Sequence, residues 1–489
     1  MQKNVLFTIT LILTFGVVSN VLTAERIVEQ GSLTHYIAGR LYLNEGNIKK
    51  AIEEFEKAVS LDESSISLHK DLLSLYTLEE DYEGIEREAK KIIELGTPDL
   101  DTYLKLSNIY MIKGNISQAQ LYIQKALELD SNNIELRLLL SRLYLQTGLD
   151  KKAIKELRRA LKIEPKSILV YLTLASYFES KERYNKALKI YKKAHGLDKE
   201  DIQILGKIGD IYLKMGNNKK ALAYFEEVLD RDPDDLGALY SLALIYEDQC
   251  NWEQAVYYLE KINSIQEADL WEIKLYLGFL YLQLKRCEDA RRILSEAIEI
   301  KPDESNLWYF LGIAEASLDN YEEAIESYRM AIKYNPQNYD AYFNLGVCYD
   351  RLRKYEESYM AFKKVIEINP KHASAHNYLG YSWADRGINL DEAYGLIQKA
   401  LILEPNNGAY IDSLGWVYYR QGRYKLALQQ LKRAIKLAKD PVIFEHLGDT
   451  YLRLDKKQQA IEYYKKALDI DSSNEKLRGK LKALNSLPE

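Results

Sequence analysis

The chain has little of the residue types that cross-link, kink or loosen a fold. Its 489 residues include only 3 Cys, 9 Pro and 24 Gly. Three cysteines do not supply the paired framework of a disulfide-rich protein. Because proline and glycine interrupt regular structure, their scarcity favours helices joined by short turns. Hydrophobic residues at 47% and charged residues at 29% argue against a disordered chain.

Long runs of one charge sign are also missing. The net charge of −6 is spread over the whole length, and no long basic run marks the footprint of a nucleic-acid-binding protein. No glycine-rich phosphate loop occurs, nor the hydrolase patterns G-x-S-x-G and H-E-x-x-H. The sequence therefore predicts no enzyme, no cofactor and no nucleic-acid partner.

Residues 1–24 have the pattern of a targeting segment. Lys3 supplies a positive start, Val5 to Val18 is mostly apolar and uncharged, and Ala24 ends the segment with a small residue. This order predicts a cleaved signal peptide. An uncleaved membrane anchor is the alternative, because Val5 to Ala24 is about long enough to span a bilayer. We expect an exported, periplasmic protein, or one anchored in the inner membrane with its repeats facing the periplasm.

Small residues recur along the rest of the chain with a period of 34. A second series of alanines lies seven residues after the first, from Ala58 to Ala467, and a series of Gly, Ala and Ser lies about twelve residues before it, from Gly39 to Gly448. Ile85 and Ser358 fill two gaps in the first series. The first series, with slips of one residue, is Ala51, Ala119, Ala153, Ala187, Ala221, Ala255, Ala290, Ala324, Ala393, Ala427 and Ala460.

These series have a mechanical meaning. Two helices approach closely only where their side chains are small, so each series is expected at a contact between successive helices. Prolines stand where one repeat ends and the chain must reverse. They are Pro165, Pro233, Pro302, Pro336, Pro370 and Pro405.

At these positions the sequence resembles the tetratricopeptide repeat (TPR) family. The fullest copy of the family pattern is Trp308-Tyr309-Phe310-Leu311-Gly312, followed by Tyr321, Ala324, Tyr328, Ala331 and Pro336. The resemblance covers about thirteen repeats from Ser32 to about Asn474. It implies an all-α fold, a right-handed superhelical solenoid of helix-turn-helix repeats.

The resemblance also sets the expected organisation. Residues 1–24 are the signal peptide or anchor, 25–31 a short linker, 32–474 the repeat array, and 475–489 a capping helix and tail. The second repeat has Leu73, Ile85 and Ile92 where small residues are expected, so it should be helical but less regularly packed. The stretch from His376 to Arg386 resembles a group of exported bacterial TPR proteins, which supports an envelope location.

Two features could suggest chemistry. His372 and His376 have the spacing of two metal ligands on one helix face, but no Cys or Glu joins them, so we interpret them as ordinary residues of a helix start. Cys250 and Cys287 fall in turns of adjacent repeats, and Cys348 is expected to be buried. We expect free thiols, and a bridge between Cys250 and Cys287 is the alternative.

The candidate binding surface follows from the groove positions of TPR proteins, where helix A of each repeat lines the concave side. Carried over to the seventh to twelfth repeats, these positions predict an aromatic groove edged with carboxylates, although pure packing between repeats is the alternative. Glu445 and Asp449 continue the acidic edge. The predicted groove residues are Tyr240, Leu244, Leu275, Phe279, Tyr309, Ile313, Phe343, Val347, Asp350, Tyr381, Asp385, Asp412, Trp416 and Tyr419.

The sequence thus predicts a non-enzymatic protein-interaction scaffold of the bacterial cell envelope. Its partners would be one or more proteins or peptides, held in the concave groove, with a membrane contacted only through an uncleaved N-terminal segment. A holdase-like assembly factor for outer-membrane or secreted proteins is the alternative function.

Overall fold

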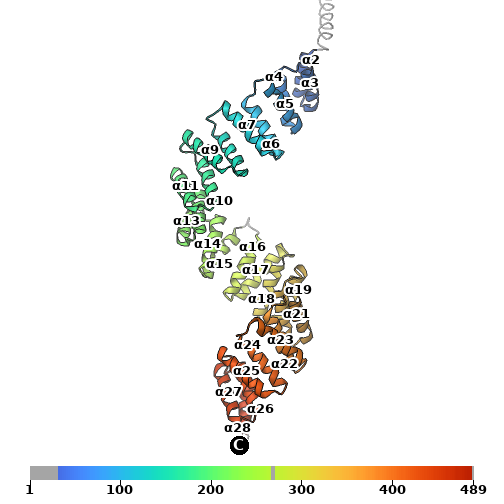
Figure 1. The fold of residues 1–489 in the computed structure, drawn as a ribbon, viewed down its shortest axis with the longest axis vertical. Helices are drawn as coiled ribbons and strands as arrows, with labels where there is room; N and C mark the ends of the chain where they lie inside the picture. The colour runs from blue at the N-terminus through green and yellow to red at the C-terminus, as the bar shows by residue number, and fades with distance from the viewer. Residues whose placement is uncertain (1–30, 266–269, 487–489) are drawn as a thin grey trace, which may run out of the picture. The chain divides into compact units, whose positions relative to one another are not determined.

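The computed structural model describes residues 31–265 and 270–486. These residues form 27 helices, α2 to α28, and none of them is in a strand, so the predicted all-α fold is confirmed. The helices alternate between an A helix, with an even label, and a B helix, with an odd label (Figure 1). Within the described part of the chain, α2 to α27 make the thirteen expected pairs. The predicted targeting segment, residues 1–24, lies outside the described residues.

By its contacts the chain divides into two compact units, Met1–Val228 and Leu229–Glu489, and the division falls within α13 (Asn218–Arg231). In the first unit the A helices are α2 (Ser32–Asn44), α4 (Ile66–Leu78), α6 (Leu100–Ile112), α8 (Ile134–Gln146), α10 (Ile168–Ser180) and α12 (Ile202–Lys214). The B helices there are α3 (Ile48–Leu61), α5 (Tyr82–Glu94), α7 (Ile116–Leu129), α9 (Asp150–Ile163) and α11 (Tyr184–Leu197).

The second unit continues the alternation and ends with one unpaired helix, α28 (Glu475–Ser486). Its A helices are α14 (Leu236–Asp248), α16 (Trp271–Gln283), α18 (Ser305–Ser317), α20 (Tyr339–Arg351), α22 (Ala373–Arg386), α24 (Gly408–Arg420) and α26 (Pro441–Arg453). Its B helices are α15 (Trp252–Ser264), α17 (Cys287–Ile300), α19 (Tyr321–Tyr334), α21 (Tyr355–Ile368), α23 (Leu390–Leu403), α25 (Tyr424–Leu437) and α27 (Lys457–Ile470).

Helix starts and the turns between A and B helices are fixed locally. Asp or Asn side chains cap many helix N-termini, as where Asp201 accepts from the backbone N–H of Gln203 and Ile204. The turn after an A helix contains a residue with positive φ, often glycine, as at Gly216. Non-glycine residues such as Asp319 take the same conformation at a cost of about 1 kcal/mol.

The three small-residue series form the core. Every alanine of the first two series is fully buried. The glycines of the third series let a large B-helix side chain touch the A-helix backbone, because a Cβ on Gly312 would lie 2.6 Å from the ring of Tyr328. The spacing of small residues therefore predicted the helix contacts correctly.

In the second repeat the large and the small side chain at the contact between the A helix and the B helix have exchanged places. Leu73 on α4 is 2% exposed and stands where other repeats have a small residue, and Ala89 on α5 is 0% exposed where others have a large one. Gly84 then admits Tyr76, whose ring would lie 2.5 Å from a Cβ at that glycine. The second repeat is therefore helical but packed in a different pattern from the others, and the two exchanged residues are sixteen positions apart.

Near the start of several A helices, one side chain forms a hydrogen bond to the segment that connects its repeat to the preceding repeat. This side chain donates to the backbone carbonyl six residues earlier, where the preceding B helix has just ended. Trp308 Nε1 donates to Pro302 O at 2.8 Å, and His376 Nε2 lies 3.0 Å from Pro370 O. His372 caps α22 by accepting from the N–H of Ala375. The interpretation of His372 and His376 as helix-start residues is therefore confirmed.

Three further local features are the turn of the eleventh repeat, the cysteines and the last helix. Helix α22 has 14 residues where each other A helix has 13, and Gly387 and Asn389 after it have positive φ. Cys250, Cys287 and Cys348 are free thiols, and Cys348 is buried as predicted. Leu477 and Leu484 of α28 are buried against the last helix pair, so the predicted final helix is present.

Candidate partner-binding surface

The predicted groove residues all lie on A helices of the second unit, from α14 to α24. Most are half-buried, and Tyr240 is 41% exposed. Asp412 and Trp416 differ, because only 6% and 7% of their surfaces are exposed. The surface therefore has an open part, on α14 to α20, and a part at α24 where the chain's own contacts cover Asp412 and Trp416.

An apolar pocket opens between α14 and α16. It has a volume of ≈ 460 Å³ and is lined by Tyr240, Leu244, Glu247, Leu270, Glu272, Ile273 and Tyr276. Tyr240 and Tyr276 meet edge to face with ring centroids 6.5 Å apart. The hydroxyl of Tyr276 donates to Glu247, and burial raises the pKa of that carboxyl. Two predicted residues thus face a cavity with apolar walls and an acidic rim.

A second pocket, of ≈ 430 Å³, lies among α18, α19 and α20. The predicted residues Ile313 and Val347 line it, together with Asn344 and Arg351. Asn344 Nδ2 donates weakly to the hydroxyl of Tyr309 at 3.5 Å. This pocket mixes apolar walls with a cation, so it differs in character from the acidic rim at α14 and α16.

Aromatic contacts join successive A helices between and beyond these pockets. Phe279 of α16 packs edge to face on Phe310 of α18, at 5.8 Å between centroids. Phe343 of α20 packs likewise on Tyr378 of α22, at 5.3 Å. Leu275 belongs to the same apolar cluster as Phe279. These side chains stabilise the stacking of repeats and still leave part of their surface open.

At α24 and α26 the predicted residues form a closed polar cluster. His446 Nδ1 lies 2.9 Å and 3.1 Å from the two carboxylate oxygens of Asp412. The indole of Trp416 stacks on one side against His446 and donates through Nε1 to Asp385 at 3.2 Å. The ring of Tyr419 stacks on Trp416 with centroids 4.5 Å apart. Sequence reasoning missed His446, although its place in the last repeat corresponds to groove positions in the others.

Carboxylates from several repeats converge on Tyr381 of α22. Burial raises the pKa of its hydroxyl, and the charges of Asp385, Asp412 and Glu445 raise it further. Burial also raises the pKa of Asp350, whose carboxylate accepts from Ser382 at 3.5 Å. Carboxylates of α20, α22, α24 and α26 therefore act together on Tyr381.

The chain itself neutralises the end of this acidic edge. Lys480 of α28 lies 2.8 Å from Glu445 and 2.8 Å from Asp449, both on α26. Glu445 and Asp449 were expected to be open groove-edge carboxylates, and the structure instead pairs them with the final helix. The reason is that the final helix sits where the A helix of a further repeat would lie.

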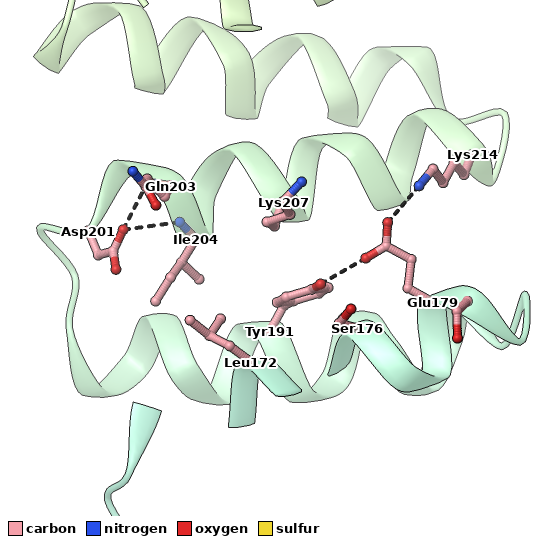
Figure 2. Close-up of a pocket in the computed structure, with 10 residues that line it drawn as sticks. Leu172, Ser176, Glu179, Tyr191, Asp201, Gln203, Ile204, Lys207 and Lys214 are labelled. Carbon is pink, nitrogen blue, oxygen red and sulfur yellow. Dashed lines mark hydrogen bonds and ion pairs between the residues drawn. The ribbon is translucent and has the colours of Figure 1, made fainter. Parts of the chain in front are cut away.

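The first unit has a pocket that the sequence analysis did not anticipate. Its volume is ≈ 480 Å³, between α10 and α12, with Leu172 and Ile204 facing each other across it (Figure 2). Glu179 accepts from Lys214 at 2.6 Å and from Tyr191 at 2.8 Å, so its charge is satisfied. The sequence could have predicted this pocket. Leu172 and Ser176 occupy the groove positions of their A helix, but those positions were considered only in the seventh to twelfth repeats.

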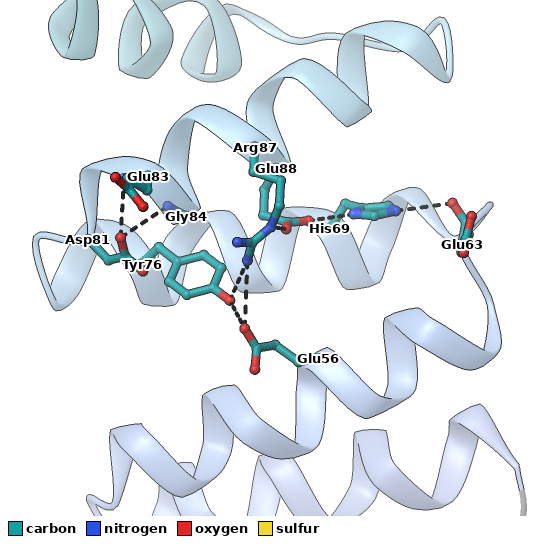
Figure 3. Close-up of polar contacts among 9 residues, drawn as sticks. All are labelled: Glu56, Glu63, His69, Tyr76, Asp81, Glu83, Gly84, Arg87 and Glu88. Carbon is teal, nitrogen blue, oxygen red and sulfur yellow. Dashed lines mark hydrogen bonds and ion pairs between the residues drawn. The ribbon is translucent and has the colours of Figure 1, made fainter. Parts of the chain in front are cut away.

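A polar cluster in the second repeat could be mistaken for a reactive site. His69 Nδ1 lies 2.6 Å from Glu88, and Arg87 donates to Glu88 and to the hydroxyl of Tyr76 (Figure 3). Tyr76 in turn donates to Glu56 on α3. Each charged group has a partner, so the cluster links α3, α4 and α5 rather than presenting a free nucleophile or base.

The described residues contain neither a metal-binding cluster nor a helix that could span a membrane. No group of three or more His, Cys, Asp or Glu side chains is placed to hold a metal ion within residues 31–265 and 270–486. Across the same residues, every helix is too short or too polar to cross a bilayer.

Comparison with known families agrees with the helix pairs. Models described as tetratricopeptide repeat match residues 34–65, 110–177, 168–234, 207–268, 339–372 and 413–475, and one described as TPR repeat matches 314–352. A TPR repeat-containing protein of Pseudomonas aeruginosa is 42% identical over 73 residues, which is 15% of this chain and 12% of the relative. Another, from Methanocaldococcus jannaschii, is 31% identical over 83 residues, 17% of this chain and 15% of the relative. The chain thus spans less than a fifth of either relative's length.

Solved structures with similar helix arrangements have low sequence identity. A tetratricopeptide repeat protein from Parabacteroides merdae is 18% identical, with 51% of this chain and 99% of that chain covered and a TM-score of 0.44. Yeast Tom70 is 18% identical, with 93% and 95% covered and a TM-score of 0.36.

Proposed function

The chain belongs to the tetratricopeptide repeat family, whose fold implies protein partners and typically a non-enzymatic role, and on that premise we propose that it is an interaction scaffold of the cell envelope. The partner-binding site is the open part of the A-helix surface in the second unit, from α14 to α20. One observation carries this proposal: Tyr240 and Leu244 line an apolar pocket beside Tyr276, with Glu247 and Glu272 at its rim.

The chemistry of the pocket indicates what it would take. Exposed aromatic side chains supply much of the energy of protein interfaces, and an apolar anchor of a peptide would fill the space between Tyr240 and Tyr276. Carboxylates at the rim favour a basic residue next to that anchor. Trp416 is a poorer anchor than the sequence suggested, because its faces are already covered by His446 and Tyr419.

The experiment compares two double variants in the full-length protein after in-cell cross-linking. Tyr240→Ala with Leu244→Ala removes the pocket walls, and Tyr257→Ala with Met360→Ala removes similarly exposed apolar side chains from the B helices α15 and α21. A partner that the first variant loses and the second keeps supports the site. If the first variant keeps every cross-linked partner of the wild type, the α14–α16 pocket is not the site.

The envelope location rests on residues 1–24, with Lys3, the uncharged apolar stretch from Val5 and the small residue Ala24. We propose export to the periplasm, with retention as an inner-membrane anchor as the alternative. N-terminal sequencing of the protein released by osmotic shock tests this. A mature chain that begins at Glu25 fits cleavage, whereas an intact chain in the membrane fraction fits the anchor, and an intact chain in the cytosol contradicts both.

A holdase-like assembly factor remains the second candidate, because aromatic contacts recur on several A helices. It predicts weak binding of many unfolded clients rather than one or two tight partners. Light scattering of an aggregating outer-membrane protein, with and without this protein, separates the two functions. Suppression that survives Tyr240→Ala with Leu244→Ala would favour the holdase.

A further inference from the structure

Two consecutive B helices of the first unit, α9 and α11, are strongly basic in a chain whose net charge is −6. Residues 151–200 contain 14 Lys and Arg against 6 Asp and Glu, although the whole chain has 67 and 73. The expectation that charge is evenly spread was therefore wrong for this segment. The two helices carry ten exposed cations: Lys151, Lys152, Lys155, Arg158, Arg159, Lys162, Lys186, Lys189, Lys192 and Lys193.

These cations have few anionic partners of their own. Helix α9 has two carboxylates, and α11 has none. Glu156 is buried and already accepts from Arg137 and Arg159, each at 2.5 Å. Asp150 pairs with Lys181 at 3.0 Å. Among the described residues, no carboxylate lies within 4.0 Å of the amino group of Lys152 or Lys155.

A pocket of ≈ 400 Å³ opens beside these lysines, among α7, α8 and α9. Leu127, Leu140 and Tyr144 form its apolar wall, and Lys152, Lys155 and Arg159 stand at its basic side. Glu128 and Glu156 also line it, and Glu156 is the carboxylate already bonded to two arginines. The Nε of Arg137, another lining residue, is buried without a hydrogen-bond partner.

We propose that the B-helix surface of α9 and α11 binds an acidic segment of a protein partner, with one side chain of that segment entering the α7–α9 pocket. Charge complementarity selects an anionic occupant, because the exposed cations outnumber the free carboxylates. The pocket selects a polypeptide, because a single side chain can enter a recess of this size whereas a flat bilayer cannot. Lys152, Lys155, Arg159 and Lys162 follow helical spacing and so form one row along α9.

This surface is separate from the proposed scaffold site. That site lies on A helices of the second unit and has an acidic rim, whereas this one lies on B helices of the first unit and is basic. The chain would therefore hold two partners of opposite charge on different helices. Either binding activity can be lost without the other.

The chain offers a matched control for the test. Lys50 on α3 corresponds to Lys152 on α9, since each amino group lies over the tyrosine ring of its own A helix, at 5.4 Å from Tyr42 and 5.5 Å from Tyr144. Lys49 and Lys50 are exposed, as are Lys152 and Lys155. Lys152→Gln with Lys155→Gln and Lys49→Gln with Lys50→Gln each remove two exposed positive charges from a B helix. The control pair shares the position of Lys152 but leaves the α9 row intact, because Lys49 corresponds to Lys151 and not to Lys155.

The probe is a fluorescein-labelled peptide of alternating Glu and Leu, and its anisotropy is measured with the full-length protein at low and physiological salt. We expect binding that weakens with salt, a loss of about tenfold in the Lys152 and Lys155 variant, and little change in the Lys49 and Lys50 variant. No binding by the wild type, or equal losses in both variants, would overturn the proposal. Vesicles of anionic phospholipid that bind with the same dependence on Lys152 and Lys155 would also overturn it, in favour of a membrane.

Discussion

The imidazole of His446 lies almost flat on the indole of Trp416, with ring centroids 3.9 Å apart and planes 15° from parallel. The same imidazole is bonded through Nδ1 to the buried carboxylate of Asp412. This contact joins α26 to α24 and turns two predicted groove residues into part of the packing between the last repeats. It also places a titratable group inside the packing between the last two repeats.

Stability of the second unit should decrease as the pH rises above the ordinary titration range of histidine. Burial lowers the pKa of His446, but the charge and hydrogen bond of Asp412 outweigh it, and the net pKa is raised. A raised pKa means that the stabilisation is fully present below the pKa of unfolded histidine, about 6.5, and is lost as pH rises through the folded-state pKa. The nearby charges of Glu445 and Asp449 act in the same direction.

Urea unfolding followed by tryptophan fluorescence measures the stability of the second unit at each pH, because all five tryptophans lie in that unit. The wild type should have a higher unfolding midpoint at pH 6 than at pH 8, and His446→Gln should remove most of that difference. Asp412→Asn should cost about 3 kcal/mol near pH 6 because it leaves a buried charge unpaired. An unchanged pH dependence in His446→Gln would show that another group is responsible.

Adding one methyl group should have opposite effects at two glycines of the second unit. A Cβ at Gly312 would lie 2.6 Å from the buried ring of Tyr328, so Gly312→Ala should destabilise the unit by about 2 kcal/mol. Gly395 on α23 has no atom within 4 Å of such a Cβ, so Gly395→Ala should stabilise it by about 1 kcal/mol. Tryptophan-detected urea unfolding measures both, and a loss of stability at Gly395 would contradict the packing argument.

The three cysteines should react with iodoacetamide in order of exposure. Cys250 is exposed, Cys287 is intermediate, and Cys348 is 2% exposed. Burial also raises the pKa of Cys348 to about 11, which removes the reactive thiolate near pH 8. Peptide mass spectrometry of the native protein should find Cys250 labelled first and Cys348 last. Labelling in urea should reach all three, and a pair that stays unlabelled there would indicate a bridge.

The final helix should loosen when its lysine is neutralised. Lys480→Gln leaves Glu445 and Asp449 without their cation, so α28 should lose about 1.5 kcal/mol of docking free energy. Hydrogen exchange of the peptide that contains α28 would rise several-fold. Lys482→Gln removes a charge from an exposed position of the same helix and serves as the control. Equal exchange in the two variants would mean that Leu477 and Leu484 alone hold the helix.

Sequence reasoning located the helices and their contacts because those depend on residues close in the chain. The period of 34 placed Ala324 and Ala331 in the core, and both are fully buried. The period of 34 did not predict that Ala89 would compensate for Leu73. That compensation depends on the fit between two side chains on different helices, which the spacing of small residues does not describe. The carbonyl-capping role shared by His376 and Trp308 was equally invisible, because residues of unlike type perform it.

The sequence predicted the candidate site only in part, because the exposure of a side chain depends on contacts between repeats. Two of the predicted groove residues, Tyr240 and Leu244, line one pocket. Whether a side chain on an A helix stays open depends on what the next repeat places over it, and His446 covers Trp416 while Lys480 covers Asp449. The basic surface of α9 and α11 was missed because net charge was considered over the whole chain.

The sequence by itself determined that the chain forms helix pairs, because small side chains at fixed spacing allow close approach only between neighbouring helices. Tertiary structure decided which of the remaining side chains are available to a partner, since exposure is set by contacts between repeats. Tyr240 remains open and Asp412 does not, although both occupy the same kind of position in the repeat.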